Sequence, residues 1–578
     1  MKLTEALQIL KDQPPGGSRP FRVALGCGFS PLHLSTFLAA HLARRQPDRQ
    51  VAVESGIYGD LPGNIGKARG ERGDGACVVV EWPDLDARLG LRQLGRWSLD
   101  ALDDILASAR QAWDVLERSI SGLAEAMPVA LALPTLPLPP VSHAPGWQAS
   151  ALESGLRGLV AAGGGRLQGR PGIRLLNAQR LDRDSPPAAR LDPASEIRHG
   201  FPYAMGHADA LANLLALLLA PPAPKKGLIT DLDDTLWMGT LGEDGEAGIH
   251  WDLDRGGHRH ALYQRMLDAL ASAGVLVAVA SRNDAALAGK ALKRPDLLIP
   301  GDQFFPVEAG WGPKSDAVAR ILRAWNIGAG DVVFVDNQPS EVAEVQLAHP
   351  GICGVTFPER EAEVWALLGE LRDLFGKPAV TGEDALRMPS LRAGAEFQAG
   401  VAGEGASAEQ FLAQADARIS WTRRSRPVDP RALELVNKTN QFNLNGRRFG
   451  EQEWRARLEA PQAFLGVFSY EDKYGRLGKI AVVGGRKQGR RLEVDVWVMS
   501  CRAFSRRVEH QCLQGLFRGF DVDEIAFACA PSGRNQVFLD FLDAVGARDL
   551  GGTRVLGRPA FEQACPPLYH RMEETSHD

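Results

Sequence analysis

Short, uninterrupted runs of apolar residues alternate with amphipathic stretches in the middle of the chain. The apolar runs lie at 227–232, 275–281 and 331–336. The amphipathic stretches, in which apolar residues recur at helical spacing, lie at 260–274, 314–327 and 339–350. Such runs predict strands buried on both faces, and their alternation with helices is typical of a parallel sheet covered on both sides. We therefore predict a Rossmann-like parallel-sheet core for this part of the chain.

The two ends of the chain show different patterns. Before the middle part, strand-like runs that suggest another α/β domain lie at 21–30, 51–61, 76–86 and 127–140. After it, strand-like runs that suggest antiparallel strands mixed with helices lie at 464–472, 478–486 and 490–500. Stretches marked by Pro and Gly, at 221–226 and 375–390, separate these parts. We expect a multidomain α/β protein with domains at 1–222, 223–376 and 391–578, the last of them α+β.

Composition and charge exclude several classes of protein for this chain. A chain of 578 residues exceeds what one hydrophobic core organises, and a formal net charge of -5 gives no field that favours nucleic acid. The seven cysteines are odd in number and contain no C-x-x-C pair, which argues against disulfides or zinc. The most apolar helix, 210–220, is too short to span a bilayer, and the N-terminus lacks the apolar core of a signal peptide. We expect a cytoplasmic protein that binds neither nucleic acid nor membranes.

Carboxylates cluster where the first strand of the middle part ends. Asp231, Asp233 and Asp234 fall within four positions of "GLITDLDDTLWMGTLGEDG". Like charges this close raise one another's pKa values unless a cation or hydrogen bonds compensate. Ser281 and Asp336 stand at the ends of two further predicted strands, and ligands of parallel sheets bind beyond the carboxyl ends of strands. The sequence therefore predicts a site at this edge of the sheet.

The residue types in this cluster suit phosphoryl transfer. Asp231 is expected to attack phosphorus, and Asp233 to protonate the leaving oxygen and then deprotonate the attacking water. Lys314 is expected to offset the charge of the nucleophile. The predicted cofactor is Mg²⁺, which favours a few carboxylates and several waters, here with Asp231, Asp233 and Asp336 as ligands. The predicted phosphate-binding residues are Ser281, Arg282 and Asn283.

The motifs in the middle part resemble those of the haloacid dehalogenase (HAD) superfamily. "DLDDTLW" matches its D-x-D-x-T motif, "AVASRND" the second motif, Lys314 the third and "FVDNQPSE" the fourth. A lone D-x-D-x-T is equally explained by a capped helix start, but four motifs in order on the expected elements are not. One departure concerns the fourth motif, which often has two adjacent acids, whereas the second position here is Asn337. Either the metal site is weaker for this reason or Glu341 assists.

Longer stretches resemble the FkbH-like branch of that superfamily. These are the first-motif stretch quoted above, "GWGPKSD" and "VFVDNQPSE", and in the last domain "VNKTNQFNLNGRRF", "DKYGRLGKIAVV" and "VWVMSCRAFSRRVEHQCL". The resemblance implies removal of phosphate from a D-1,3-bisphosphoglycerate-derived glyceryl group and its loading, as a thioester, on an acyl carrier protein of a secondary pathway. About forty residues separate the first motif from the second strand, which leaves no room for a bulky cap over the site.

The resemblance also implies that the last domain is a GNAT-like acyltransferase. In that fold, a glycine-rich strand-to-helix turn binds the coenzyme A pyrophosphate. Ser505 and Arg507 replace both glycines here, so binding of free coenzyme A is not expected. Arg502, Arg506 and Arg507 are expected instead to contact the phosphate of a carrier-bound pantetheine.

Two further groups in the last domain are candidates for the transfer step. Cys501 directly precedes the turn and is either an acyl relay made acidic by the helix N-terminus and the arginines, or a buried core cysteine. Asn440, Gln441 and Asn443 are expected to bind substrate hydroxyls and carboxylates.

The first domain resembles SGNH hydrolases, which many FkbH-like proteins carry at the N-terminus. Ser30 follows the first strand and His207 precedes the last helix, as a hydrolase requires. The G-D-S and G-x-N-D motifs are missing, and Ala204 occupies the position of the Asp partner. We expect a degenerate, non-hydrolytic SGNH-like domain.

Two other readings of the whole chain remain open at this stage. One is a Mg²⁺-dependent HAD phosphatase acting on another small phosphorylated metabolite, with the flanking domains as scaffolds. The other is a non-enzymatic scaffold for carrier proteins.

Overall fold

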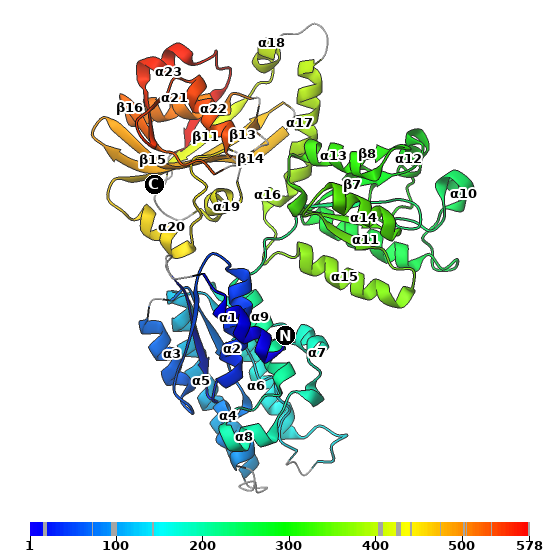
Figure 1. Ribbon diagram of the computed structural model, residues 1–578, viewed down its shortest axis with the longest axis vertical. Helices are drawn as coiled ribbons and strands as arrows, with labels where there is room; N and C mark the ends of the chain where they lie inside the picture. Colours follow the sequence, from blue (N-terminus) through cyan, green and yellow to red (C-terminus); the bar gives the residue numbers. More distant parts are fainter. Residues whose placement is uncertain are drawn as a thin grey trace. The chain divides into compact units, whose positions relative to one another are not determined.

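The computed structural model describes the following residues: 1–14, 20–71, 73–93, 101–140, 144–402, 408–423, 429–439, 442–473, 475–500, 503–504, 506–532 and 535–575. The chain forms two compact units, Met1–Ala223 and Pro224–Asp578 (Figure 1). The boundary coincides with the predicted Pro-rich separator. The second unit contains both the middle part and the last part of the sequence. Within the described ranges, no helix has the length and apolar character needed to cross a membrane.

The first unit is built on a five-stranded parallel sheet in the order β2-β1-β3-β4-β5. Its strands are β1 (Phe21–Cys27), β2 (Val51–Ser55), β3 (Gly75–Val79), β4 (Val129–Ala132) and β5 (Ile173–Leu175). The first four lie within the predicted runs. The fifth has three residues and was not predicted, because so short a run carries no periodicity of its own.

Helices cover both faces of this sheet, as expected for an α/β domain. One buried core packs the sheet against α1 (Leu3–Lys11), α2 (Leu32–Arg45) and α9 (Met205–Leu219). The other packs it against α3 (Leu61–Gly70), α5 (Leu102–Ala126) and α6 (Ala151–Gln168). The shorter helices are α4 (Trp82–Leu85), α7 (Ala178–Asp184) and α8 (Pro193–His199).

The middle part of the sequence forms a second five-stranded parallel sheet, in the order β10-β9-β6-β7-β8. Its strands are β6 (Gly227–Thr230), β7 (Leu276–Ser281), β8 (Phe304–Ala309), β9 (Val332–Asp336) and β10 (Cys353–Thr356). The three predicted strands are the central β6, β7 and β9, which are buried along their whole length. The unpredicted β8 and β10 are the edge strands and are only partly buried, so their sequences lack a continuous apolar run.

Helices cover both faces of this sheet as well. One core involves α11 (His258–Ser272), α12 (Ala285–Ala291) and α15 (Glu361–Phe375). The opposite core involves α13 (Lys314–Trp325) and α14 (Pro339–Ala348). Between β6 and β7 the chain forms only α10 (Leu241–Gly248) and α11, which agrees with the expected lack of a bulky cap.

The last part of the sequence forms a mixed, mainly antiparallel sheet of nine strands. The strands are β11 (Arg418–Arg423), β12 (Phe442–Asn443), β13 (Ala463–Asp472), β14 (Gly475–Gln488), β15 (Arg491–Met499), β16 (Glu524–Ala528), β17 (Arg548–Asp549), β18 (Thr553–Gly557) and β19 (Arg571–Thr575). The three predicted strands are β13, β14 and β15. Only the first half of β15 pairs with β16, in parallel, while its end pairs with β12, so the sheet opens at that end of β15.

Two layers of helices complete the last part. One core contains α21 (Val508–Phe520) and α22 (Gln536–Ala544), and the other contains α19 (Pro430–Lys438) and α20 (Glu451–Leu458). The remaining helices of the second unit are α16 (Gly382–Ala385), α17 (Arg387–Ala402), α18 (Ala408–Ala413) and α23 (Arg558–Ala564). Helix α17 contacts both α13 and β14, and thereby connects the two sheets within the second unit.

Candidate functional site

The predicted site lies at the carboxyl ends of three adjacent strands. Asp231 directly follows β6, Ser281 ends β7 and Asp336 ends β9. Strand β6 lies between β7 and β9, and the Asp231 amide donates to the carbonyl of Val335 at 3.0 Å. The chain passes from β6 towards β7 on one side and returns to β9 on the other, so the site sits at the switch point where ligands of such sheets bind.

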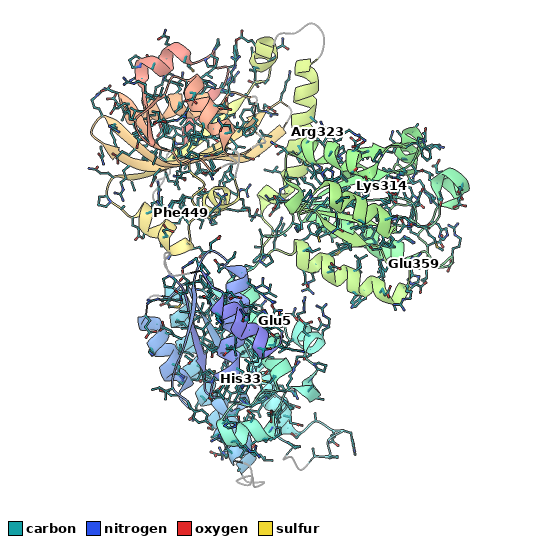
Figure 2. All side chains as sticks on the ribbon, in the orientation of Figure 1. Glu5, His33, Lys314, Arg323, Glu359 and Phe449 are labelled. Carbon is teal, nitrogen blue, oxygen red and sulfur yellow. The ribbon has the colours of Figure 1, made fainter. Side chains whose placement is uncertain are left out.

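Lys314 holds the two central carboxylates together. Its Nζ lies 3.0 Å from Oδ2 of Asp231 and 2.5 Å from Oδ2 of Asp336. All three side chains are buried. The lysine is the first residue of α13, which begins after Pro313 and contributes to the core on one face of the sheet. Figure 2 labels Lys314 in the green part of the second unit. A buried carboxylate pair without such a cation carries a large desolvation cost.

Burial and the neighbouring opposite charges shift the pKa values of these three groups in opposite directions. Burial raises the pKa of Asp231 to about 6, with Lys314 lowering it and Asp336 raising it further. Burial also raises the pKa of Asp336, again against the attraction of Lys314. Burial alone would lower the pKa of Lys314, but the two carboxylates reverse this and raise it above the usual lysine value. The lysine therefore stays charged at neutral pH.

The arrangement around Asp231 fits a hard cation. Its Oδ1 is buried and accepts no hydrogen bond from the residues that the structure describes, an orphaned position that a cation would satisfy. Asp231 and Asp336, which share Lys314, would hold such a cation together with water, and a contribution from the predicted third ligand, Asp233, stays a prediction. Mg²⁺ has this preference for few carboxylates and several waters.

Asp233 is held by donors of its own. Oδ1 accepts from Trp237 Nε1 at 2.9 Å and from the Leu241 amide at 3.1 Å, and Oδ2 accepts from Asn283 Nδ2 at 3.0 Å. These contacts fix the carboxylate beside the site, and both of its oxygens accept hydrogen bonds. Its role as an acid and base suits this position, whereas its predicted role as a side-chain metal ligand gains no support from these contacts. The sequence reasoning did not identify Trp237, although "DDTLW" places it four residues on.

The second-motif residues split between the two sides of the site. Asn283 also donates to Ser281 Oγ at 3.1 Å, and both side chains are buried. Arg282 is half exposed and pairs with Glu341 Oε1 at 3.0 Å, while Glu341 Oε2 is buried without a partner. Ser281 and Asn283 are thus hydrogen-bonded to each other at the end of β7, and Arg282 is held by Glu341. Phosphate binding by these three residues stays a prediction.

The third carboxylate and the unusual asparagine have structural partners. Asp234 adopts a left-handed conformation with φ 49° and accepts from the Gly239 amide at 3.0 Å. The Asn337 amide donates to Thr235 Oγ1 at 3.0 Å. Neither side chain contacts the Lys314 cluster through a recorded hydrogen bond. The three neighbouring acids therefore each have different hydrogen-bond or ion-pair partners. These partners offset the repulsion between their charges.

The candidates in the last part of the chain are only partly described. Cys501, Arg502, Asn440 and Gln441 lie outside the described residues. Asn443 is buried, accepts from the Asn445 and Gly446 amides and donates to the Thr439 carbonyl. Arg506 is buried, lies against Tyr470 and pairs with Asp472 at 3.3 Å. These contacts give Asn443 and Arg506 structural roles, and their binding of substrate or carrier stays a prediction.

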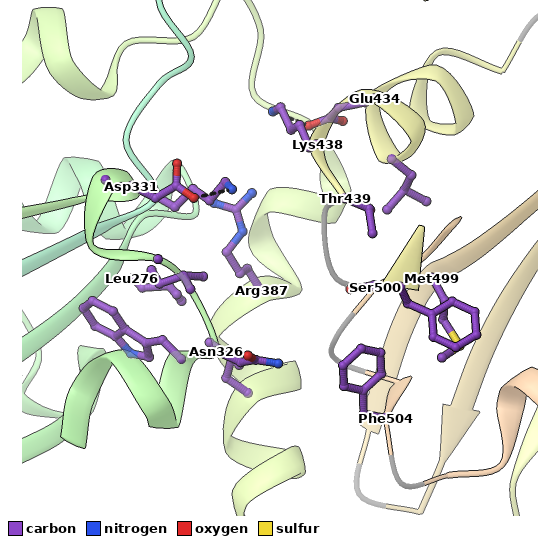
Figure 3. Close-up of a pocket in the computed structure, with 18 of the residues that line it drawn as sticks. Leu276, Asn326, Asp331, Arg387, Glu434, Lys438, Thr439, Met499, Ser500 and Phe504 are labelled. Carbon is purple, nitrogen blue, oxygen red and sulfur yellow. Dashed lines mark hydrogen bonds and ion pairs between the residues drawn. The ribbon is translucent and has the colours of Figure 1, made fainter. Parts of the chain in front are cut away.

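Described neighbours of these candidates line a cavity in the second unit (Figure 3). Its volume is about 710 Å³, and its walls include Thr439, Met499 and Ser500, which directly precede the undescribed candidates. Arg387 and Lys438 bring positive charge to the same cavity, partly balanced by Glu434. A cavity of this size accommodates a drug-sized ligand or an extended chain.

The first unit does not form a hydrolase triad from the predicted pair. His207 is buried, with Nε2 2.9 Å from Thr135 Oγ1 and Nδ1 3.0 Å from Ser185 Oγ. Burial, aided by Arg190, lowers the pKa of His207 to about 3, so the ring is neutral. Ser30 has no recorded contact with it. Both ring nitrogens are thus occupied by side chains other than the predicted nucleophile.

Comparison with known proteins identifies solved structures with a related fold. A scan against protein-family models and a search of curated proteins both give no match. The crystal structure of the N-terminal part of the protein BF1531 from Bacteroides fragilis, which contains a phosphatase domain and is complexed with Mg, matches with a TM-score of 0.53. The match has 19% sequence identity and covers 66% of this chain and 100% of that chain. The two chains share a fold.

The salicylyl-acyltransferase SsfX3 from a tetracycline biosynthetic pathway also matches, with 17% identity over 36% of this chain and 57% of that chain. Its TM-score of 0.23 is too low to support a common fold.

Proposed function

We propose that this protein is a Mg²⁺-dependent phosphatase and acyltransferase of the FkbH-like type. In this proposal it removes phosphate from a D-1,3-bisphosphoglycerate-derived glyceryl group and loads that group on an acyl carrier protein. The observation that carries the phosphatase part is the Asp231–Lys314–Asp336 cluster at the sheet's switch point, with Asp231 Oδ1 left without a hydrogen bond. The described Mg complex of the structural neighbour supports the choice of cation.

The side chains suggest how phosphate leaves its ester. An Asp231 oxygen attacks phosphorus and forms an aspartyl-phosphate, while the bond from phosphorus to the substrate oxygen breaks. Asp233 gives a proton to that oxygen, then takes one from a water molecule that attacks the same phosphorus and frees Asp231. Lys314 and the Ser281 hydroxyl stabilise the phosphoryl oxygens. A bound Mg²⁺ would supply further positive charge beside Asp231 and Asp336.

Access to the site supports a large second substrate. Only α10 and α11 lie between β6 and β7, so no separate cap domain is inserted there. The cavity beside Thr439, Met499 and Ser500 gives the candidate transfer residues a place for an extended arm. The resemblance of the last part of the sequence to FkbH-like proteins supports glyceryl as the group and a carrier thiol as its acceptor.

One alternative remains: a phosphatase acting on a different small phosphorylated metabolite. The contacts around Ser281, Arg282 and Asn283 select no particular phosphorylated substrate. The buried charge cluster around Lys314 is costly for a protein that only scaffolds carriers, which disfavours the non-enzymatic reading.

The decisive experiment incubates the protein with bisphosphoglycerate, Mg²⁺ and candidate phosphopantetheinylated carriers. Intact-mass spectrometry of the carriers and assay of free phosphate are performed on the same samples, with EDTA-treated protein as the control. The proposal expects a carrier mass increase of one glyceryl group together with phosphate release, both lost with EDTA. Phosphate release without any carrier mass change supports the alternative, and release that persists in EDTA contradicts both.

A further inference from the structure

A cavity of about 350 Å³ lies at the carboxyl ends of β1, β3 and β4 in the first unit. Its walls are mainly apolar, and include Phe29, Leu61, Trp82, Leu89, Leu136 and Leu138. In a sheet of order 2-1-3-4-5, the crevice beside β1 and β3 is the expected ligand position. Pockets of this volume, apolar with a few polar groups, are typical of small-molecule sites.

Asp84 is one of five polar side chains that line this cavity, the others being Tyr58, Glu81, Arg92 and Glu196. Asp84 Oδ2 accepts from the Glu81 amide at 2.8 Å. A methyl group added at Gly28 would lie 1.7 Å from its Oδ1, so the end of β1 accommodates this carboxyl only because residue 28 is glycine. No hydrogen bond to Oδ1 occurs among the residues that the structure describes. That oxygen is the one available to a ligand.

The other carboxyls at the cavity are already engaged. Glu81 is buried and accepts from Thr135 Oγ1 at 2.5 Å and from Tyr203 OH at 2.8 Å. Glu196 at the rim lies 3.8 Å from Arg92. These acids disfavour an anionic ligand, and the apolar walls disfavour any charged group that gains no partner.

The protonation of Asp84 also bears on the ligand. Burial, and to a smaller extent the neighbouring Glu81, raise the pKa of Asp84 to about 7. Near neutral pH its carboxyl thus both donates and accepts hydrogen bonds. An amide, which offers an N–H and a C=O side by side, satisfies either state.

The cavity contains the means to bind but not to hydrolyse. Its described lining residues include no Ser, Cys, His or Lys, and Ser30 is not among them. In the described lining, no His or Lys stands beside Asp84 to act as a base for a hydrolytic step. We therefore consider this cavity as a binding site.

We propose that the first unit binds an uncharged, mainly apolar molecule bearing an amide group, whose N–H or C=O forms a hydrogen bond with Asp84 Oδ1 at the head of this cavity. The amide belongs either to a free molecule or to the arm of a carrier, and the two share this chemistry. The inference is independent of the phosphatase site.

The test uses the full-length protein and three probes of equal chain length: hexanamide, hexanoate and hexylammonium. Binding is measured at pH 7 by ligand-observed NMR titration. We expect saturable binding of hexanamide, at least about tenfold tighter than that of either ion. Pantetheine, an uncharged chain with two amides, is the fourth probe: binding about tenfold tighter than hexanamide indicates a carrier arm, and weaker binding indicates a free amide.

Substitutions test whether hexanamide binds in this cavity and contacts Asp84. Leu138→Trp fills the cavity and is expected to abolish the hexanamide signal, with Leu138→Phe used if circular dichroism shows that the first does not fold. Asp84→Leu is expected to weaken binding about tenfold, the effect of one lost hydrogen bond, whereas Asp84→Asn retains both hydrogen-bonding functions and keeps it within about threefold. Asp103→Asn, an exposed carboxylate of the same unit, is the matched control. The proposal is overturned if neither amide binds saturably, if an ion binds tightest, or if filling the cavity changes nothing.

Discussion

At the scale of single residues, a few buried charges determine what the site can do. Asp231, Lys314 and Asp336 form one cluster, and Asp233 stands apart with donors from Trp237 and Asn283. The nucleophile and the acid-base group thus receive different environments although they are only two positions apart in the sequence. Such differences in environment are how enzymes assign different tasks to like carboxyls.

Asp231→Asn is expected to abolish phosphate release. The amide is a poor nucleophile and a poor magnesium ligand, so the rate should fall by at least about 10³-fold. The fold should persist, because Lys314 retains its 2.5 Å contact with Asp336. Phosphate release and circular dichroism are measured together. Asp234→Asn makes the same chemical change at a residue bonded only to the Gly239 amide, in a conformation that Asn tolerates, and should stay near the wild-type rate. A fully active, folded Asp231→Asn protein rules out the proposed nucleophile.

Lys314→Met is expected to destabilise the second unit. Removing the ammonium leaves two buried carboxylates without their cation, a change that typically costs about 3–5 kcal/mol. Urea unfolding, without added Mg²⁺, measures the loss. Lys290→Met removes an exposed lysine paired with Glu246 and should cost less than about 1 kcal/mol. Equal losses of unfolding free energy for the two substitutions would show that the buried ion pairs stabilise the fold no more than an exposed pair does.

Asp84 predicts a pH dependence of stability in the first unit. Its folded-state pKa of about 7 exceeds the ordinary pKa of an aspartate side chain, 3.8, because burial disfavours the charged form. The folded state therefore binds this proton more tightly than the unfolded chain. The resulting stabilisation is complete below about pH 4 and is lost as pH rises through 7.

Chemical denaturation at pH 5 and pH 8 tests this dependence. Relative to Asp84→Asn, the wild type should lose on the order of 2 kcal/mol between the two pH values, after allowance for partial solvent access. Asp103→Asn should retain the wild-type slope. If Asp84→Asn also retains it, Asp84 titrates as an ordinary exposed carboxyl.

At the scale of elements, the end of α11 is clamped by the segment that follows the parallel sheet. Lys377 Nζ donates to the Ala273 carbonyl at 2.9 Å and to Asp384 Oδ1 at 2.8 Å. Arg387 donates to the Gly274 carbonyl at 2.8 Å. These contacts join the turn before β7, the strand that carries Ser281, to α16 and α17.

Gly274→Ala is expected to break this clamp. Gly274 has φ 80°, and an added methyl group would lie 2.4 Å from the Asp384 carbonyl oxygen, so the backbone must move. We expect a loss of at least about 2 kcal/mol in thermal or urea unfolding. Gly289→Ala, inside α12 with open space around it, should be neutral or stabilising by up to about 1 kcal/mol. The opposite ranking would show that this turn is not closely packed.

At the scale of the whole molecule, the chain divides between Ala223 and Pro224 into two compact units. The phosphatase candidates all belong to the second, and each unit has its own buried cores. We expect a protein comprising residues 224–578 to fold and to release phosphate at a rate comparable to that of the full chain. Phosphate assay and a cooperative unfolding transition check this expectation. An insoluble or inactive product would show that the first unit is needed for folding or catalysis.

Much of the architecture follows from the sequence alone. The central strands β6, β7 and β9 are apolar on both faces and could be predicted, because full burial of a strand requires a continuous apolar run. The edge strands β8 and β10 could not, since one partly exposed side leaves no such run. The meeting of Asp231, Ser281 and Asp336 was also predictable, because parallel strands bring their carboxyl ends to one edge.

Other features depend on contacts between residues far apart in the chain. The sequence predicted Asp233 as a metal ligand, and that role stays a prediction. It could not show that Asn283, fifty residues away, and a turn that returns Trp237 and Leu241 direct this carboxylate. His207 suggested a hydrolase, but Thr135 and Ser185 occupy its nitrogens. The sequence by itself determined which residues can react and at which strand ends they stand. Only the tertiary structure decided which oxygen atoms remain free, because hydrogen-bond partners and desolvation arise from side chains that packing alone brings together.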